Sequence, residues 1–560
     1  MAKKFYVTTP IYYANGLPHI GHANSSFIAD FYARYKRLLG YEVKFATGLD
    51  ENGQKMVEKA ESEGKQIMEF LDEIAEGSKE IWKELDITYT DFIRTTEADH
   101  HAFVQAQLQK IYEKDRIPLT KGGSEAGGSD SETGLLRSSQ GQKKDDIYLG
   151  EYEGLYCVGC EAFKNPRDLT LDGLCPDHLT KPEIIREKNW FFNLKKYEYV
   201  FKKLWEGNPH FVEPGHRFNE VKAFVNSGLE NFSISRENKH TGIGIPLPRD
   251  KEQITYVWFD ALFNYITVCY RNEEEGKFWS DGAEILHVLG KDIVKFHATY
   301  WPAMLTSAGF RQPDREFVTG YLTVDGQKMS KTIGNVVDPV KVARDYDRDA
   351  LLFYLLYDVA IGLDGDFSWE RFQGTWEKML IGGRGNLVNR VANLGKKYGV
   401  TKGKFDEKRF GEFLKKEEMK AGEESLFSGL LRFARNDIEE GYLQNANTKR
   451  YLEDWYSLVQ LANEYITKAE PWKKYKEETT KQEAIEDLEF LLWVIKQLGL
   501  LSAPFLVNGF AKLQKILGNP KISAIDSSKN VMHEGFVEVF DEQEFEVNLD
   551  PMIMYERKEV

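Results

Sequence analysis

The stretch FYVTTPIYYANGLPHIGH, residues 5–22, decides the fold class predicted for this chain. Residues 5–9 predict a strand, and residues 16–18 (GLP) predict the turn that follows it. Beyond the turn, apolar residues recur at steps of three and four on one face of a helix that ends at Gly40: Ile20, Ala23, Phe27, Phe31, Tyr35 and Leu38. A second strand is predicted at residues 41–47. This strand–helix–strand order predicts a doubly wound parallel sheet, which binds ligands at the carboxyl ends of its strands.

The composition is that of a large globular protein. The chain has 560 residues, 42% hydrophobic and 29% charged, which suggests three or four domains of ~150 residues each. A net charge of −15 argues against non-specific binding to nucleic acid but leaves room for a local basic face. No apolar run reaches the ~20 residues of a membrane span, and the first residues resemble neither a secretion signal nor an import leader. We therefore expect a cytoplasmic protein without a membrane partner.

The segment PHIGH, residues 18–22, places two histidines at the start of the predicted helix. A helix N-terminus favours phosphate, and imidazoles there can donate to an oxyanion that gains charge in a transition state. Gly21 has no side chain, so a flat base can approach the backbone. His19 and His22 are therefore candidate phosphate ligands, although two surface histidines are the commoner explanation of such a motif in isolation.

A second segment, GQKMSKTIGN at residues 326–335, carries two lysines three positions apart. Such a loop can close over a triphosphate and place the ammonium groups of Lys328 and Lys331 on it. The alternative is a solvated basic loop. Paired with the histidine motif about 300 residues upstream in an α/β chain, the segment is highly specific.

Together these two motifs resemble the signature of class I aminoacyl-tRNA synthetases, and further segments are similar to the methionyl branch of that family. The resemblance covers the chain except residues 118–146 and the extreme C-terminus. It is carried by TTPIYYANGLPHIGHA (8–23), TGLDENGQK (47–55), YVWFDALFNYI (256–266), LGKDIVKFHATYWPAML (289–305), DGQKMSKTIGNVVDP (325–339), NLVNR (386–390) and AEPW (469–472). Thr332 stands where many relatives have Ser, a departure that keeps the hydroxyl.

The resemblance implies an ATP-dependent methionine–tRNA ligase. Such an enzyme forms methionyl-adenylate and pyrophosphate with Mg²⁺-bound ATP, then transfers the methionyl group to the 3′-terminal adenosine of tRNA(Met), including the initiator tRNA. The implied catalytic residues are His19, His22, Lys328 and Lys331. The implied ATP site comprises His19, Gly21, His22, Gly290, Asp292 and Lys331. The implied methionine site comprises Pro10, Ile11, Tyr13, Asp50, Trp258, Ala261, Leu262, Tyr265, Ile293 and His297.

Two of these residues, Trp258 and Tyr265, are expected to follow a strand of the doubly wound sheet, which favours a site over ordinary core packing. Asp50 matches the partner of the methionine ammonium group. Two alternatives have a different function: a non-catalytic tRNA-binding relative, which would not need the histidines and lysines, and another class I synthetase.

The spacing Cys157-x2-Cys160-x14-Cys175-x2-His178 predicts one zinc ion. Each pair forms a knuckle, and together they supply three sulfurs and one nitrogen for tetrahedral coordination. Four protein ligands leave no open position, so the ion is expected to be structural. The alternative is three buried cysteines that bind no metal. The resemblance places this knuckle in the insertion that splits the catalytic domain.

Asn386 and Arg390 lie four positions apart on one predicted helical face. The resemblance implies that they and Trp472 bind the anticodon, since single-stranded RNA is recognised by stacking and by hydrogen bonds to base edges. Without the resemblance, Arg390 is a solvated charge and Trp472 a packing residue.

The predicted fold class is an α/β Rossmann-type catalytic domain, split by a zinc-bearing insertion and followed by an α-helical anticodon-binding bundle. A monomer is expected, and the last thirty residues, from FVEV (536–539) onward, are predicted to be partly strand-like. The predicted division of the chain is 1–115 and 231–310 for the two catalytic halves, 116–230 for the insertion with a flexible segment at 118–146, 311–368 for the stem-contact region, 369–525 for the helical domain and 526–560 for a C-terminal tail.

Overall fold

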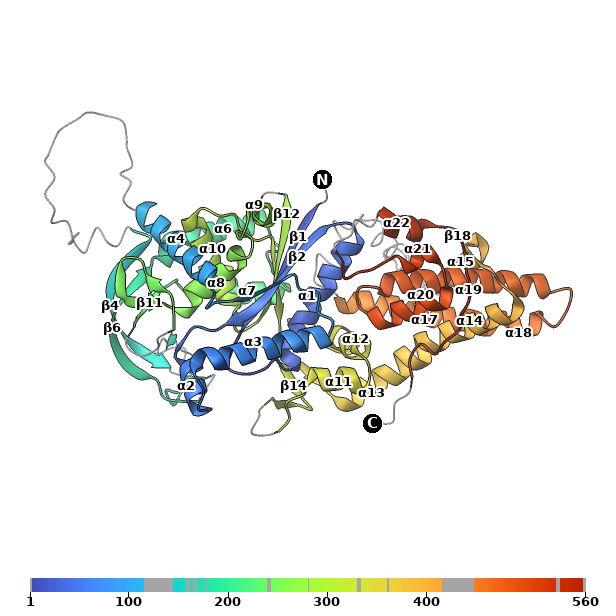
Figure 1. Ribbon diagram of the computed structural model, residues 1–560, viewed down its shortest axis with the longest axis horizontal. Coiled ribbons are helices and arrows are strands. Elements are labelled where there is room, and N and C mark those ends of the chain that lie inside the picture. The colour runs from blue at the N-terminus through green and yellow to red at the C-terminus, as the bar shows by residue number, and fades with distance from the viewer. Residues whose placement is uncertain are drawn as a thin grey trace, which may run out of the picture.

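The computed structural model describes residues 3–114, 145–157, 162–164, 169–176, 179–238, 243–280, 282–329, 334–359, 362–414, 448–529 and 534–556. The predicted flexible segment 118–146 lies outside these ranges except for its last two residues. The molecule is elongated, with an α/β region at one end and a helical region at the other (Figure 1). Among the described residues, no helix has the length and apolarity needed to cross a membrane.

A parallel sheet forms the centre of the α/β region. In the described part of the chain it has six strands in the order β3-β2-β1-β12-β13-β7, and each adjacent pair is parallel. Their bounds are β1 Lys4–Tyr13, β2 Glu42–Asp50, β3 Asp91–Arg94, β7 Val212–Glu213, β12 Ala283–Gly290 and β13 Arg315–Thr319. The strand order reverses between β1 and β12, which makes their carboxyl ends the expected ligand site of a doubly wound sheet. The predicted Rossmann-type fold is confirmed.

Alternate residues of β1 face two different cores, as the pleat of a strand requires. Phe5 and Val7 pack in the core that contains α1 (Ile20–Leu38), whereas Tyr6 packs in the core that contains α8 (Val257–Thr267) and α10 (Trp301–Ala308). Helix α1 has the predicted extent, and the chain leaves it through Gly40 at a φ of +78°. Helices α1 and α8 therefore cover opposite faces of the sheet.

Residues between 147 and 255 form two separate antiparallel sheets, although β7 of the same stretch joins the parallel sheet. Strands β4 (Ile147–Cys157), β5 (Ala162–Lys164), β6 (Glu183–Phe192) and β8 (Phe232–Ser233) make one of them, at the end of the molecule opposite the helical region (Figure 1). Strand β11 (Asp250–Thr255), which precedes α8, pairs with β9 (Ser235–Glu237) and β10 (Pro246–Leu247). The expectation that Trp258 follows a strand of the doubly wound sheet was therefore wrong, because β11 belongs to this smaller sheet.

The helical region begins at η5 (Trp376–Gly385) and includes α14 (Asn386–Tyr398), α15 (Glu407–Leu414), α17 (Thr448–Ala469), α18 (Pro471–Lys474), α19 (Lys481–Ser502) and α20 (Val507–Leu517). The strand-like prediction for the last thirty residues was wrong at 536–539, which lie in helix α22 (Glu534–Asp541), but a strand does form further on, at residues 544–546. Phe536, Val539 and Phe540 follow a helical spacing, and all three are buried. Next in the chain, β18 (Glu544–Glu546) pairs with β17 (Lys402–Lys404) of the helical region.

Candidate functional site

The carboxyl ends of three neighbouring strands bring predicted site residues to one edge of the sheet. Strand β1 leads into the histidine motif, β2 ends at Asp50, and β12 ends at Gly290. Tyr13 of β1 lies opposite Asp50 in the register of the parallel pair. The site predicted from separate parts of the sequence is therefore assembled where the strand order reverses.

His19 and His22 stack on each other at the start of α1. Their ring centroids are 4.0 Å apart. Nδ1 of His19 accepts a hydrogen bond from the Gly21 amide at 3.0 Å, and Nδ1 of His22 accepts one from the His19 amide at 3.2 Å. A neutral imidazole whose Nδ1 accepts carries its proton on Nε2. Both rings therefore hold an N–H group on the nitrogen that faces away from the helix backbone.

The electrostatic environment keeps His22 neutral. Burial, together with the neighbouring His19, lowers the pKa of His22 to about 3. The hydroxyl of Tyr12 donates to the His22 carbonyl at 3.2 Å, and the two rings lie 4.6 Å apart. The sequence did not single out Tyr12, which holds the first turn of α1 against β1.

The lysine motif lies against the histidine motif. It begins in a hairpin of β14 (Leu322–Val324) and β15 (Gln327–Lys328). A Cβ on Gly21 would lie 2.9 Å from Cε1 of His19 and 3.4 Å from Cε of Met329, so the glycine permits the close approach of both motifs. Lys328 is exposed at the end of the hairpin, whereas Lys331 lies outside the described residues.

The turn after β12 carries Asp292, which is exposed. A Cβ on Gly290 would lie 2.6 Å from Oδ1 of Asp292. The glycine therefore leaves room for this carboxylate beside the end of the strand. Lys291 between them points elsewhere, since its ammonium group donates to Asp364 at 2.7 Å.

The predicted methionine residues gather mainly on α8 and on the segment after β12. Nδ1 of His297 lies 3.1 Å from the Ile293 carbonyl, which can only accept, so Nδ1 carries the proton. Burial lowers the pKa of His297 to about 4, and its neutral Nε2 then accepts from the Tyr265 hydroxyl at 2.8 Å. Trp258 stacks on Phe296 with centroids 4.1 Å apart. Phe296 is a wall residue that the sequence reasoning missed, although it stands next to His297.

The other predicted methionine residues are distributed around this centre. Leu262 and Tyr265 are buried in one core cluster, against which Ile11 packs, while Ile293 packs against the neighbouring cluster. Ala261 and Asp50 are buried. Pro10 is half-buried on β1, and Tyr13 is exposed with the Lys55 ammonium group 5.9 Å from its ring.

Two of the four predicted zinc ligands are described, and they converge. Cys157 ends β4 and Cys175 lies in the following loop, and both are buried. Sγ of Cys157 is 3.9 Å from Oγ1 of Thr180, and the amide of Cys175 donates to the Thr180 carbonyl at 2.8 Å. Cys160 and His178 lie outside the described residues, which by themselves contain no group of three metal-binding side chains. Two buried cysteines that both contact Thr180, one through its thiol and one through its backbone amide, fit a zinc knuckle, and the zinc ion stays a prediction.

A cavity of about 440 Å³ lies in the helical region between α14 and α18. The guanidinium carbon of Arg390 is 5.4 Å from the centre of the Trp472 ring. Asn386, the first residue of α14, is exposed and lies outside the lining. The cavity is lined by Asn389, Arg390, Asn393, Leu394 and Trp472. The sequence reasoning missed Asn389 and Asn393, which the repeat of asparagines at helical spacing in NLVNRVANL could have indicated.

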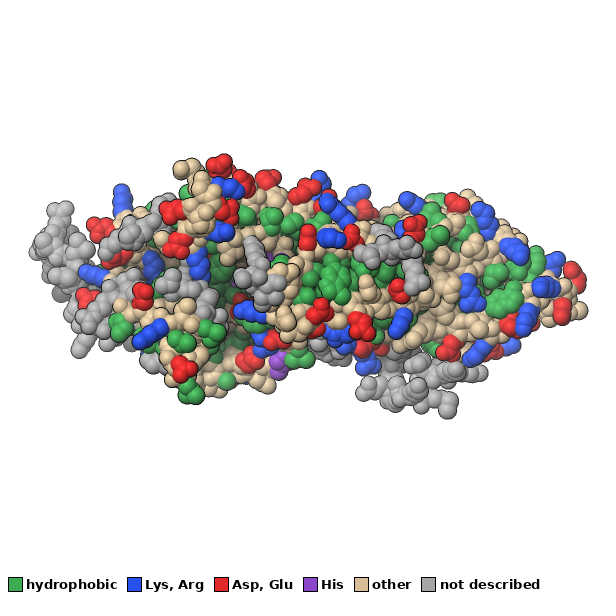
Figure 2. Space-filling view, turned by 90° about the horizontal axis from the view of Figure 1, so that it is seen from below, with side chains coloured by type: hydrophobic (Ala, Val, Ile, Leu, Met, Phe, Trp, Pro, Cys, Tyr) green, Lys and Arg blue, Asp and Glu red, His purple; other side chains and the backbone are tan. Residues whose placement is uncertain are grey.

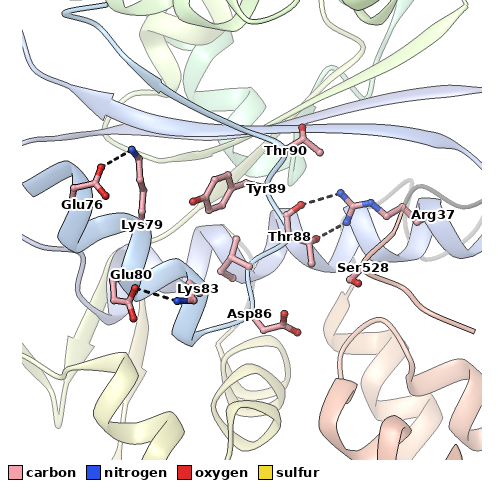
Figure 3. Close-up of a pocket in the computed structure, with 11 residues that line it drawn as sticks. Arg37, Glu76, Lys79, Glu80, Lys83, Asp86, Thr88, Tyr89, Thr90 and Ser528 are labelled. Carbon is pink, nitrogen blue, oxygen red and sulfur yellow. Dashed lines mark hydrogen bonds and ion pairs between the residues drawn. The ribbon is translucent and has the colours of Figure 1, made fainter. Parts of the chain in front are cut away.

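A second cavity, of about 620 Å³, lies away from these sites (Figure 3). One of its lining residues, Arg37, stands near the end of α1, about 27 Å from His19 at 1.5 Å per residue. Its guanidinium group donates to the hydroxyl and the carbonyl of Thr88 at 2.5 and 3.0 Å. The other charged side chains of the lining also pair locally, as Lys79 does with Glu76 at 2.8 Å. The positive and negative side chains of the lining neutralise each other, so we expect no charged ligand in this cavity.

Charge is mixed on the outer surface as well. On the face drawn in Figure 2, acidic and basic side chains alternate along the length of the molecule. This distribution agrees with the net charge of −15. This face therefore offers no broad basic surface for an RNA (Figure 2).

Comparison with known proteins gives matches along most of the chain. The family model for class I tRNA synthetases (M) matches residues 5–124 and 177–392, and the model for the anticodon-binding domain of methionyl tRNA ligase matches residues 419–537. A methionine–tRNA ligase of Nostoc sp. is 38% identical over 92% of this chain and 90% of its own length. That of Thermotoga maritima is 40% identical over 70% of this chain and 58% of its own length. Among solved structures, Mycobacterium tuberculosis methionyl-tRNA synthetase in complex with methionyl-adenylate has a TM-score of 0.83 at 29% identity, covering 99% of this chain and 100% of that one.

Proposed function

This chain belongs to the methionyl family of class I tRNA synthetases, and on that premise we propose which of its residues carry each step. It is a methionine–tRNA ligase: it activates methionine with ATP and transfers the product to tRNA. The observation that carries the assignment of residues is the contact between its two signature motifs, since Met329 lies against Gly21.

In the first step, the methionine carboxylate attacks the α-phosphorus of ATP and pyrophosphate leaves. Negative charge builds up on the phosphate oxygens, so positioned donors and cations lower the barrier. His19 and His22 supply neutral N–H donors at the amino end of α1, where the helix dipole also favours phosphate. Lys328 and Lys331 supply positive charge from the facing loop. Mg²⁺, which binds mainly through substrate phosphates and water, would accompany the ATP.

The nucleotide is held at the ends of β1 and β12. Gly21 has no side chain, so the adenine can approach the backbone there, next to His19 and Met329. Asp292, exposed after Gly290, can accept hydrogen bonds from the ribose hydroxyls.

Methionine binds between Asp50 and the aromatic side chains of α8 and the segment after β12. The buried carboxylate of Asp50 pairs with the ammonium group. Tyr265, His297 and Trp258 surround the side chain, and sulfur against an aromatic ring contributes about 0.3–1.5 kcal/mol.

In the second step, a hydroxyl of the 3′-terminal adenosine of tRNA attacks the methionyl-adenylate and AMP leaves. The helical region identifies the tRNA through its anticodon. A base can stack on Trp472 while Arg390 and Asn386 donate to base edges. Both elongator and initiator tRNA(Met) are expected substrates because the two tRNAs carry the same anticodon.

The insertion would hold one zinc ion through Cys157, Cys160, Cys175 and His178. Its role there is structural, because four protein ligands complete the coordination. The convergence of the two described cysteines on Thr180 supports this assignment. A monomeric state and a cytoplasmic location also stay predictions.

The test of the proposed function is amino acid-dependent ATP–pyrophosphate exchange, run with methionine and with each other amino acid in turn. We expect exchange with methionine alone, followed by charging of tRNA(Met). Exchange with a different amino acid would identify another class I synthetase. Absence of exchange with retained tRNA binding would identify a non-catalytic relative.

A further inference from the structure

A buried carboxylate that has no part in the steps above joins two walls of the methionine site. Asp260 lies in the first turn of α8 and is fully buried. Its Oδ2 accepts from the amide nitrogen of Asn52 at 2.8 Å and from the hydroxyl of Thr255 at 3.1 Å. Asn52 is also buried, with 2% of its surface exposed. The bond therefore forms away from water, where its loss leaves polar groups unsatisfied.

The two partners stand next to residues proposed to bind methionine. Asn52 follows Asp50 by two positions on the loop that leaves β2, and Asp260 stands between Trp258 and Ala261 on α8. The same loop is also held by Thr95, whose hydroxyl accepts from the Glu51 amide at 2.9 Å. Thr95 follows β3, however, so that contact fixes the loop to the sheet and not to α8.

We propose that Asp260 is a positioning residue for methionine activation. By binding Asn52, it holds the loop of Asp50 against α8 and so sets the distance between the ammonium-binding end and the side-chain-binding wall of the methionine site. This inference rests on the proposed function, because it takes Asp50 and α8 as the two sides of that site.

The chemistry of the contact indicates that a neutral group is sufficient. The side-chain donors to Asp260, Asn52 and Thr255, are both neutral, and among the described residues neither its Oδ1 nor Oδ1 of Asn52 has a side-chain hydrogen-bond partner. Burial raises the pKa of Asp260 to about 7 although Asn52 and Thr255 oppose the shift. An amide at this position keeps one acceptor oxygen for Asn52. Asp260→Asn should therefore preserve the link that Asp260→Ala removes.

The experiment compares the KM for methionine with the KM for ATP in pyrophosphate exchange, using full-length Asp260→Ala, Asp260→Asn and Asn52→Ala proteins. We expect Asp260→Ala and Asn52→Ala to raise the KM for methionine about tenfold or more, with the KM for ATP within about threefold of the parent. Asp260→Asn should remain within about threefold for both. Asp349→Asn, a change at another fully buried carboxyl group in α12 (Arg348–Asp358), is the matched control and should leave the KM for methionine unchanged.

Three results would overturn the inference: an unchanged KM for methionine in folded Asp260→Ala, equal increases in both KM values, or an Asp260→Asn protein as impaired as Asp260→Ala. If Asp260→Ala does not fold, Asn52→Ala decides, because it removes the same bond from the other side, together with a longer bond of 3.4 Å to the Thr95 carbonyl. Failure of the proposed function is distinguishable, since the unmodified protein would then show no methionine-dependent exchange.

Discussion

Replacing Asp30 by Asn, which removes its negative charge, should destabilise the catalytic region by more than the loss of an exposed ion pair would. Asp30 lies in the middle of α1 and is fully buried. Its Oδ2 accepts from Nε of Arg34 at 2.7 Å and from Nη2 of Arg348 at 2.8 Å. Its Oδ1 accepts from the amide and the hydroxyl of Thr88 at 2.8 and 2.6 Å. One carboxylate therefore joins α1, the segment before β3 and the start of α12.

The magnitude follows from burial. Asp30→Asn leaves the side chains of Arg34 and Arg348, which are 1% and 5% exposed, without their shared carboxylate. Breaking a buried ion pair from one side costs about 3–5 kcal/mol. At about 2–4 °C per kcal/mol for a domain of 150–250 residues, the unfolding temperature of the catalytic region should fall by about 6–20 °C.

Asp86→Asn provides the matched control. Asp86 pairs with the same Arg34 at 2.8 Å, but its side chain is 54% exposed, and exposed pairs contribute at most about 1 kcal/mol. Asparagine also tolerates the positive φ of 51° at this position. Scanning calorimetry of the three proteins measures both changes. Equal shifts for Asp30→Asn and Asp86→Asn, or a shift below about 2 °C for Asp30→Asn, would refute the reasoning.

The parent protein and Asp30→Asn also allow a test of how stability depends on pH, and the direction of the effect can be predicted. Burial alone would raise the pKa of Asp30, but Arg34 and Arg348, with Thr88, lower it below the usual value. A carboxyl group with a depressed folded-state pKa stabilises the fold above its unfolded pKa of about 3.9, and this contribution is lost as the pH falls through the folded-state pKa. The stability difference between the parent and Asp30→Asn should therefore be constant from neutral pH to about pH 5 and shrink in stronger acid.

Three further predictions concern the proposed sites. His22→Ala should slow pyrophosphate exchange by about 100-fold or more, because it removes one preorganised donor, and should lower the unfolding temperature by only a few degrees, because it also removes the acceptor of the His19 amide; near-normal exchange would exclude the proposed role. Trp472→Ala should weaken the binding of tRNA by about 1–3 kcal/mol and so impair charging, while methionine-dependent exchange stays intact. Equal losses in both assays would make Trp472 a packing residue. Cys175→Ser should lower the zinc content from one ion per chain to none, as elemental analysis measures, and reduce charging more than exchange; a parent protein without zinc would contradict the metal assignment.

The parts of the fold that local sequence patterns specify could be predicted. Helix α1 has its expected bounds because its apolar face repeats every three to four residues and Gly40 supplies the left-handed residue after it. Residues 536–539 were misassigned because Val537, Glu538 and Val539 alternate between apolar and polar, as a half-buried strand does. Phe540, four positions after Phe536, is also buried, and this spacing indicates a helix.

Features that depend on contacts between distant residues could not be predicted. No local pattern reveals that β11 pairs with β9 rather than joining the parallel sheet. The bond between Asn52 and Asp260 spans 208 positions in the sequence. The motifs that match the family identified His19, Asp50 and Trp258, but they could not identify Phe296, Tyr12 or Asp260, whose roles follow from how the elements pack.

The buried carboxylates of α1 and α12 show how the two ends of the molecule are joined. Helix α1 follows its capping residue His19 and is tied through Asp30 to Arg348, the first residue of α12. The next residue, Asp349, accepts from the amides of Asn508 and Gly509 at 3.2 and 2.7 Å, in the first turn of α20. Each of these buried groups would cost about 1–3 kcal/mol if left unsatisfied. The helix that presents the histidines and a helix of the anticodon-binding region are therefore held by one continuous set of buried polar contacts, and Asp86, on the exposed side of Arg34, lies at its margin.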